Sequence, residues 1–215
     1  MKKNNYSLML SEGVVRAIDA EAARRGTNRS ALINHILAEY VSYVTPEMRT
    51  KEILSGVLAS LDGAFRTEGE GDTGVSLYSS LSYRYRPTVR YALELYRGCD
   101  RLGEIRVSMR TQNAVLLRLF EAFCLCFAET ERRYLGDTEY NIGTGRFSRI
   151  LRLRKNDGIA DMLTLSELGT HVAAYISMLD RALKRFCAYA DDLFGAKRVI
   201  DEEYRSYLSS ASLLL

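Results

Sequence analysis

The sequence is poor in the residues that build metal sites, disulfides and chain breaks. Its 215 residues include two histidines, two prolines and four cysteines. The chain opens with Met-Lys-Lys-Asn-Asn, and no apolar segment typical of a secretion signal follows. Together with the few, widely spaced cysteines, this predicts no disulfide framework and a reducing, cytoplasmic location.

Long apolar runs are also missing. The longest, residues 114–128, contains Arg118 and Glu121, and it is shorter than the roughly 20 residues that a helix needs to cross a bilayer. No membrane span is predicted. In contrast, 47% of the residues are hydrophobic and 27% are charged. This composition excludes a disordered tail protein and allows a small module followed by a larger domain.

The first 45 residues carry the pattern of one strand followed by two helices. Apolar and polar residues alternate over residues 6–10, which predicts a short strand. Ser11 is placed to cap a first helix that ends at about Arg25. Asn28 is placed to cap a second helix, whose apolar positions recur at helical spacing as far as Val44.

A unit this small cannot bury its own core or pair a single strand. The simplest solution is a two-fold dimer, in which the strands of two chains pair antiparallel and four helices cover one face of the ribbon. The opposite face then exposes Asn5, Ser7 and Met9, flanked by Lys2 and Lys3. A narrow polar face of this kind suits the major groove of DNA.

Three motifs in residues 2–44 bear on function. They are Asn5-Tyr-Ser-Leu-Met-Leu-Ser-Glu-Gly-Val-Val-Arg-Ala-Ile-Asp, Arg25-Gly-Thr-Asn-Arg-Ser-Ala-Leu-Ile and Ile36-Leu-Ala-Glu-Tyr. Together they resemble the ribbon-helix-helix DNA-binding family of the Arc, MetJ and CopG type. Asn28 replaces the usual capping serine of the family's turn, and asparagine caps a helix as well as serine does.

The resemblance implies that the paired strands read base edges in the major groove through Asn5, Ser7 and Met9. Met9 departs from the family, which usually has a polar residue there, and offers only apolar contact, for instance to a thymine methyl. The free amides at the start of the second helix are placed to hold a phosphate. The residues expected at the DNA backbone are Lys2, Lys3, Asn28, Arg29 and Ser30. The alternative is a ribbon that only dimerises and whose polar face stays solvated.

Residues 46–215 predict a second domain, so that the fold class is α+β and mainly helical, with helices packed on antiparallel hairpins. Thr45-Pro46-Glu47 is a strong helix start, and we expect a connecting helix over residues 46–66 and a flexible loop over residues 67–74. The loop contains Gly69-x-Gly71-x-x-Gly74, but no strand precedes it, no helix follows it, and its acidic residues would repel a pyrophosphate.

The remaining elements follow from changes of hydrophobic period. A bent strand over residues 81–95, interrupted at Pro87 and placed at a sheet edge, is expected to form a hairpin with a strand over 105–110. A second hairpin is expected around Asn156-Asp157-Gly158. Helices are expected over residues 113–134, which is apolar on nearly every side, 166–194 and 201–209.

Basic residues are concentrated in the middle of this domain. Residues 80–155 contain 15 Lys and Arg against 8 Asp and Glu. Many lie on or beside the predicted strands, where they form a second surface for DNA backbone or an acidic partner, or else the solvated face of a one-sided sheet. These residues are Arg84, Arg86, Arg90, Arg106, Arg110, Arg149, Arg152 and Arg154.

The sequence offers little for catalysis. It contains no phosphate-binding loop, nucleophile elbow or paired acid motif, so we expect no catalytic residues, no cofactor and no enzyme. His35 lies among apolar positions, and Cys124 and Cys126 point apart on one helix, so no metal site is expected. This weakens any likeness to nickel-sensing ribbon-helix-helix proteins, which resemble one another in being rich in histidine and cysteine ligands.

The sequence therefore predicts a sequence-specific double-stranded DNA-binding protein that forms a homodimer, or a higher oligomer on DNA. We expect it to be a nucleoid-associated transcriptional repressor whose operators contain inverted half-sites. Its second domain is expected to sense an effector, to oligomerise or to recruit a protein partner. Two alternatives stay open. One is a plasmid or mobile-element maintenance factor acting in partition, copy control or relaxosome assembly. The other is an antitoxin-like protein whose second domain holds a toxin or another partner, while the ribbon only dimerises and autoregulates.

Overall fold

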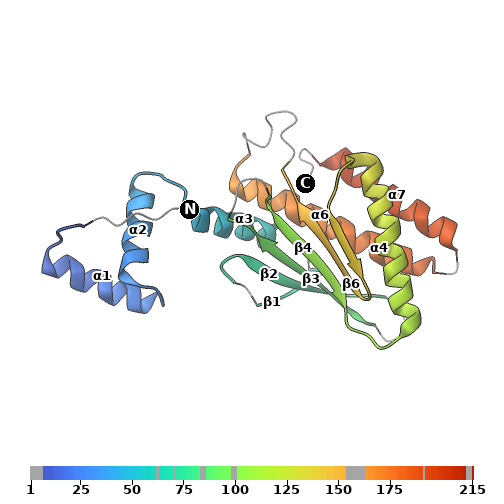
Figure 1. The fold of residues 1–215 in the computed structure, drawn as a ribbon, viewed down its shortest axis with the longest axis horizontal. Coiled ribbons are helices and arrows are strands. Elements are labelled where there is room, and N and C mark those ends of the chain that lie inside the picture. The colour runs from blue at the N-terminus through green and yellow to red at the C-terminus, as the bar shows by residue number, and fades with distance from the viewer. Residues whose placement is uncertain are drawn as a thin grey trace. The chain divides into compact units, whose positions relative to one another are not determined.

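The chain forms two compact units, residues 1–45 and residues 46–215 (Figure 1). A computed structural model describes residues 7–61, 63–69, 71–82, 86–97, 101–153, 163–190, 192–211 and 215. Each unit has its own secondary structure and is described by itself. The boundary lies between Thr45 and Pro46, where the sequence predicts a helix start.

The first unit consists of two helices, α1 (Glu12–Arg24) and α2 (Arg29–Tyr40). They join through Gly26, whose φ of +63° lies in the left-handed region that favours glycine. The Asn28 side chain accepts a hydrogen bond from the Ala31 amide at 2.9 Å, so the predicted cap is present. The second helix ends at Tyr40, four residues before the end of its apolar pattern.

The strand predicted over residues 6–10 is not found in the part of it that the structure describes. Residues 7–10 form no strand, and the first described element of the chain is α1. The ribbon-helix-helix arrangement is therefore not confirmed. The physical reason is that a lone strand has no neighbour in its own chain to which its amides and carbonyls can bond.

The second unit is built on an antiparallel sheet with the strand order β1-β2-β3-β4-β6-β5. Its strands are β1 (Arg66–Glu68), β2 (Gly74–Ser80), β3 (Thr88–Leu95), β4 (Gly103–Met109), β5 (Tyr140–Gly143) and β6 (Arg146–Leu151). Alternate side chains of the four longest strands are buried, and this period of two places them on one face of the sheet. The predicted α+β class is confirmed.

Helices cover that buried face. They are α3 (Pro46–Ser60), α4 (Ala114–Leu135), α6 (Leu165–Ala188) and α7 (Leu193–Ser210). Phe127 of α4 packs edge to face on Phe147 of β6, and Tyr91 of β3 donates a hydrogen bond to Asp180 of α6 at 3.0 Å. In Figure 1, α4 and α6 accordingly lie along the same sheet. Among the described residues, no helix is both long and apolar enough to span a membrane.

The structure corrects several expected elements. The connecting helix ends at Ser60 rather than at residue 66, and residues 67–74 are not a loop throughout, because β1 and β2 pair across a short turn there. Of the bent strand predicted over 81–95, the described residues contain the strand β3, which lies inside the sheet and not at its edge. Pro87 precedes β3, and its carbonyl accepts a hydrogen bond from the Leu81 amide. The hairpin predicted at 156–158 lies outside the described residues.

Candidate nucleic-acid interface

The predicted base-reading residues lie at the amino-terminal end of the first unit, before α1. Ser7 is exposed and Met9 is fully exposed, so both side chains are accessible before α1 begins. Asn5, Lys2 and Lys3 lie outside the described residues. The structure therefore keeps two of the three expected base readers on the surface.

The expected phosphate site lies at the start of α2. Ser30 is exposed. The side-chain oxygen of Asn28 already accepts the hydrogen bond that caps α2. Arg29 binds Asp19 of α1 through one edge of its guanidinium, Nε to Oδ1 at 2.7 Å and Nη2 to Oδ2 at 2.5 Å. These hydrogen bonds lower the pKa of the Asp19 carboxyl below its ordinary value. Arg29 is therefore held in place by α1 at the amino end of α2.

The first unit exposes an unusual amount of apolar surface. Ten of the fourteen exposed large apolar residues of the described chain lie between residues 8 and 44. They are Leu8, Met9, Leu10, Val14, Ile36, Leu37, Tyr40, Val41, Tyr43 and Val44. The apolar residues that this unit buries are Ala22, Leu32 and Ala38, two of which are small. Apolar surface concentrated in this way is typical of an interaction surface rather than of a solvated module.

Arg149, predicted to belong to a second basic surface, is buried. Its side chain is 2% exposed and its guanidinium binds both carboxylate oxygens of Glu131, itself 0% exposed, at 3.2 and 3.3 Å. Arg149 follows the buried parity of β6, between Phe147 and Leu151. The prediction was wrong for this residue because charge alone does not reveal which face of a strand a side chain takes.

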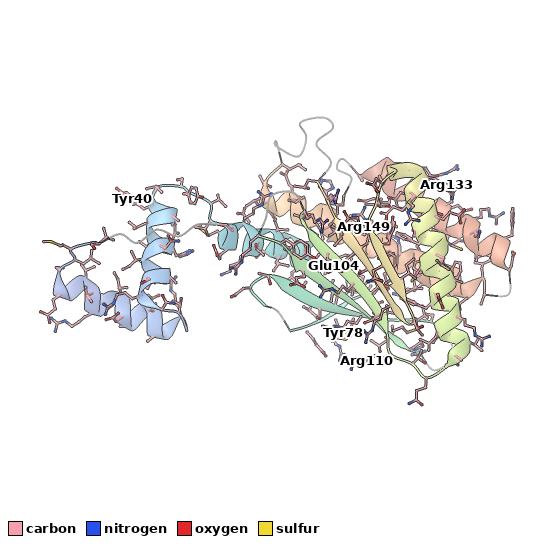
Figure 2. All side chains as sticks on the ribbon, in the orientation of Figure 1. Tyr40, Tyr78, Glu104, Arg110, Arg133 and Arg149 are labelled. Carbon is pink, nitrogen blue, oxygen red and sulfur yellow. The ribbon has the colours of Figure 1, made fainter. Side chains whose placement is uncertain are left out.

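Tyrosines complete the network around Glu131 (Figure 2 labels Arg149). Tyr175 of α6 and Tyr204 of α7 donate to Oε1 of Glu131 at 3.0 and 3.1 Å, and Tyr140 of β5 donates to Oε2. Burial raises the pKa of all three hydroxyls above the ordinary tyrosine value. The network joins the sheet to three helices, and we assign it a structural role.

Some of the other predicted basic residues form ion pairs with carboxylates, and others are exposed without such a pair among the described residues. Arg106 binds Glu104 and Glu94, at 2.6 and 3.1 Å, and Arg152 binds Glu139. The remaining ones, Arg86, Arg90 and Arg110, are exposed, whereas Arg84 and Arg154 lie outside the described residues. The basic surface is therefore smaller than the sequence predicts.

Two further arginines and a tyrosine share the exposed face of the sheet with Arg90. They are Arg66 of β1, Tyr78 of β2 and Arg146 of β6. The sequence prediction misses them, because it recognises neither β1 nor β2 and places residue 146 in no strand. The alternation of Val75, Leu77 and Ser79 with Ser76 and Tyr78 is the signal that could have revealed β2.

The cysteines do not form a reactive site in the described part of the chain. Cys124, Cys126 and Cys187 are buried, and burial raises the pKa of each thiol. No group of three or more His, Cys, Asp or Glu side chains suited to a metal ion occurs among the described residues. Gly74 lies in β2, where a Cβ would meet the Leu93 carbonyl oxygen at 2.5 Å, so it serves strand packing.

Comparison of the chain with protein-family models, curated proteins and solved structures finds no match. The function is therefore inferred from the residues and geometry described above.

Proposed function

We propose that the protein is a dimeric repressor that binds double-stranded DNA through its first unit. Residues 6–10 of two chains pair as an antiparallel ribbon, which enters the major groove with Asn5, Ser7 and Met9 towards the bases. The observation that carries this proposal is the apolar surface of the first unit. Its helices α1 and α2 are present. Asn28 caps α2, whereas Ser11 precedes α1 without a side-chain hydrogen bond to it. Leu8 and Leu10 are nevertheless exposed beside these helices.

A second copy of the chain is the occupant that this surface fits. Pairing two strands provides hydrogen-bond partners for backbone groups that a single chain cannot satisfy. The same pairing places Leu8 and Leu10 of both chains over the helices, next to exposed Ile36 and Leu37. Full burial of each such side chain contributes about 1.5–3 kcal/mol. The base-reading face exists only in this dimer, because each chain contributes one strand.

The amino end of α2 supports the proposal independently. The amides at the start of a helix and its dipole favour an anion, and Arg29 and Ser30 are exposed at this end. Asp19 orients Arg29 through two hydrogen bonds and leaves its Nη1 without a described partner. Phosphate contacts of this kind would set the position of the ribbon, while the ribbon itself selects sequence.

Selection of bound duplexes from a random pool tests the proposal. The wild-type chain should recover a consensus with inverted half-sites, and Ser7→Ala or Asn5→Ala should relax that consensus at defined positions. A pool without a consensus, or a consensus without two-fold symmetry, would contradict the ribbon. Binding positions in promoters would identify a repressor, and binding at an origin would identify a maintenance factor.

A pair of variants separates phosphate binding by Arg29 from its contact with α1. Arg29→Ala should weaken binding to every duplex. It should reduce the dependence of log K on log salt by about 1.8 for the dimer, because each of the two chains no longer neutralises one phosphate. Asp19→Ala removes the same ion pair but keeps the guanidinium, so it should retain binding. Equal losses of affinity in the two variants would show that Arg29 acts only by holding α1 against α2.

A further inference from the structure

The sheet of the second unit has an outer face that no described helix of that unit covers. Five residues on this face lie directly opposite one another across five strands, and we call them the cationic row. They are Arg66, Tyr78, Arg90, Ser108 and Arg146, paired in the register Arg66–Tyr78, Tyr78–Arg90, Arg90–Ser108 and Ser108–Arg146. Because they occupy equivalent positions of the pleat, their side chains leave the sheet on the same side.

Positive charge is concentrated at the end of the outer face where the cationic row lies. The Arg90 guanidinium donates to the neutral Ser76 hydroxyl at 2.9 Å, and Arg146 forms no ion pair with a described carboxylate. Exposed Arg110 follows β4, two residues beyond Ser108. Figure 2 shows Tyr78 and Arg110 towards one end of the sheet and Glu104 towards the other.

The carboxylates of the same face lie mostly away from the row. Glu94 and Glu104 face each other across β3 and β4, and both bind Arg106, which offsets one of their two negative charges. Glu68 pairs with Arg66 at 3.0 Å, and both side chains are more than half exposed. An exposed ion pair of this kind is weak and can exchange for another anion. The face is therefore polarised along its strands.

Tyr78 adds a flat apolar surface between two of the arginines. The Arg66 guanidinium lies over one face of the Tyr78 ring, 5.5 Å from its centre, so a base would stack on the other face or take the place of Arg66. A positively charged track with an aromatic ring along it is the combination that binds single strands, since phosphates pair with the charges and a base stacks on the ring. Acidic peptides use the charges but have no need of the ring.

The width of the face indicates whether it binds single-stranded or double-stranded nucleic acid. Four strand spacings of about 4.8 Å separate β1 from β6, so the row extends over roughly 19 Å, whereas the major groove is about 12 Å wide. A duplex could touch this flat surface only with its backbone, but a single strand can lie across it. We propose that the outer face of the sheet binds single-stranded nucleic acid, with Arg90 and Arg146 on phosphates and Tyr78 beneath a base.

This activity is separate from the proposed reading of duplex DNA. It uses residues of the second unit only, and it would persist if the ribbon did not form. The two can therefore fail independently, and the experiment uses the full-length chain with a labelled oligothymidylate of about 16 nucleotides, the upper end of single-strand site sizes.

The first measurement is the salt dependence of oligothymidylate binding. Each phosphate contact contributes about 0.7 to the slope of log K against log salt, so three arginines of the row predict a slope of about −2. The double variant Arg90→Ser/Arg146→Ser should reduce its magnitude to about 0.7. The control Lys197→Ser/Arg198→Ser removes two exposed charges from α7, on the helical layer, and should keep the wild-type slope.

The second measurement is specific to stacking. Tyr78→Leu should weaken oligothymidylate binding by about 5- to 150-fold, the equivalent of 1–3 kcal/mol for one stacked base. Tyr78→Phe retains the ring and should restore binding. Circular dichroism of each variant establishes that the sheet is intact.

Four outcomes would overturn the inference. The first is an equal loss of oligothymidylate affinity in the row variant and in the α7 control, and the second is unchanged binding of oligothymidylate by Tyr78→Leu. The third is competition by polyglutamate that is as effective as competition by unlabelled oligothymidylate. The fourth is a row variant that loses duplex binding alone. The last would assign the surface to duplex backbone. Loss of duplex selection in Ser7→Ala or Arg29→Ala with intact single-strand binding would leave this inference standing.

Discussion

Arg149 lies in β6, and Arg152 follows the end of that strand. The two side chains have the same charge but differ in burial. Arg149 is enclosed with Glu131 and three tyrosines, and Arg152 is about half exposed beside Glu139. A buried ion pair is stabilising only as a whole, because removing one partner leaves an uncompensated charge without water. Exposed pairs gain little, since water and salt screen them.

The first prediction compares these two arginines. Arg149→Met should lower the free energy of unfolding by about 3–5 kcal/mol, and Arg152→Met should change it by less than about 1 kcal/mol. Urea denaturation followed by circular dichroism measures both. Similar effects of the two substitutions would show that the Glu131 network does not depend on its arginine.

The second prediction concerns alkaline pH and Cys187. Burial raises the pKa of its thiol from an ordinary value near 9 to about 12. Between these values the unfolded chain loses the proton while the folded chain keeps it, so stability is complete below about pH 9 and falls as pH rises towards 12. Unfolding free energies measured from about pH 8 to about pH 10 should therefore decline.

Cys187→Ala tests the source of this decline. Its stability should depend less on pH in this range, which lies below the ordinary pKa of tyrosine, near 10. A decline as steep as that of the wild-type chain would exclude the thiol of Cys187 as its cause.

At the scale of elements, glycine determines how closely α3 and α6 approach. A Cβ on Gly56 of α3 would lie 2.3 Å from the Ser166 carbonyl oxygen, and one on Gly169 of α6 would lie 2.3 Å from the Ile53 carbonyl oxygen. Both obstacles are backbone atoms, which cannot move aside without separating the helices. This crossing brings the start of the second unit against its long central helix.

The third prediction follows from this crossing. Gly56→Ala should lower the free energy of unfolding by about 1–3 kcal/mol through overpacking, although alanine favours a helix over glycine. Ser55→Ala, at the exposed neighbouring position of α3, is the matched control and should be neutral or slightly stabilising. A stabilising Gly56→Ala would mean that the helices tolerate a wider separation.

At the scale of the whole molecule, the two units differ in how they satisfy their apolar surface. The second unit encloses a continuous core between its sheet and helices. The first unit leaves ten large apolar side chains exposed. We therefore expect the first unit to depend on a partner chain, while the second unit retains its fold in a single chain.

The fourth prediction is that the chain forms a dimer and that one introduced charge in α2 dissociates it. The wild-type chain should sediment at twice its 24.3 kDa mass, and Leu37→Glu should sediment as a monomer because it places a charge among exposed apolar residues of α2. Ala31→Glu adds the same charge at another exposed position of α2, in its first turn, and should remain dimeric. A wild-type monomer at micromolar concentration would contradict the ribbon.

Local signals in the sequence were sufficient to locate the starts of α1, α2, α3, α4 and α6, but α7 begins at Leu193 rather than at residue 201. Asn28, Gly26, Pro46 and Asn113 act within one helical turn, so caps and turns could be identified without knowledge of the fold. The buried parity of β3 was predicted in the same way. The short strands β1 and β5 escaped, because brief alternating segments resemble loops until their neighbours are known. The longer strand β2 was missed although its apolar and polar residues alternate.

The sequence by itself determined where five of the six described helices begin, which positions of β3 are apolar, and that the first unit cannot enclose its own apolar residues. Only the tertiary structure decided that Arg149 is enclosed with Glu131, whereas Arg90, Arg66 and Arg146 share one exposed row. The physical reason is that burial and charge pairing depend on residues brought together from distant parts of the chain, as strand register and helix packing bring them.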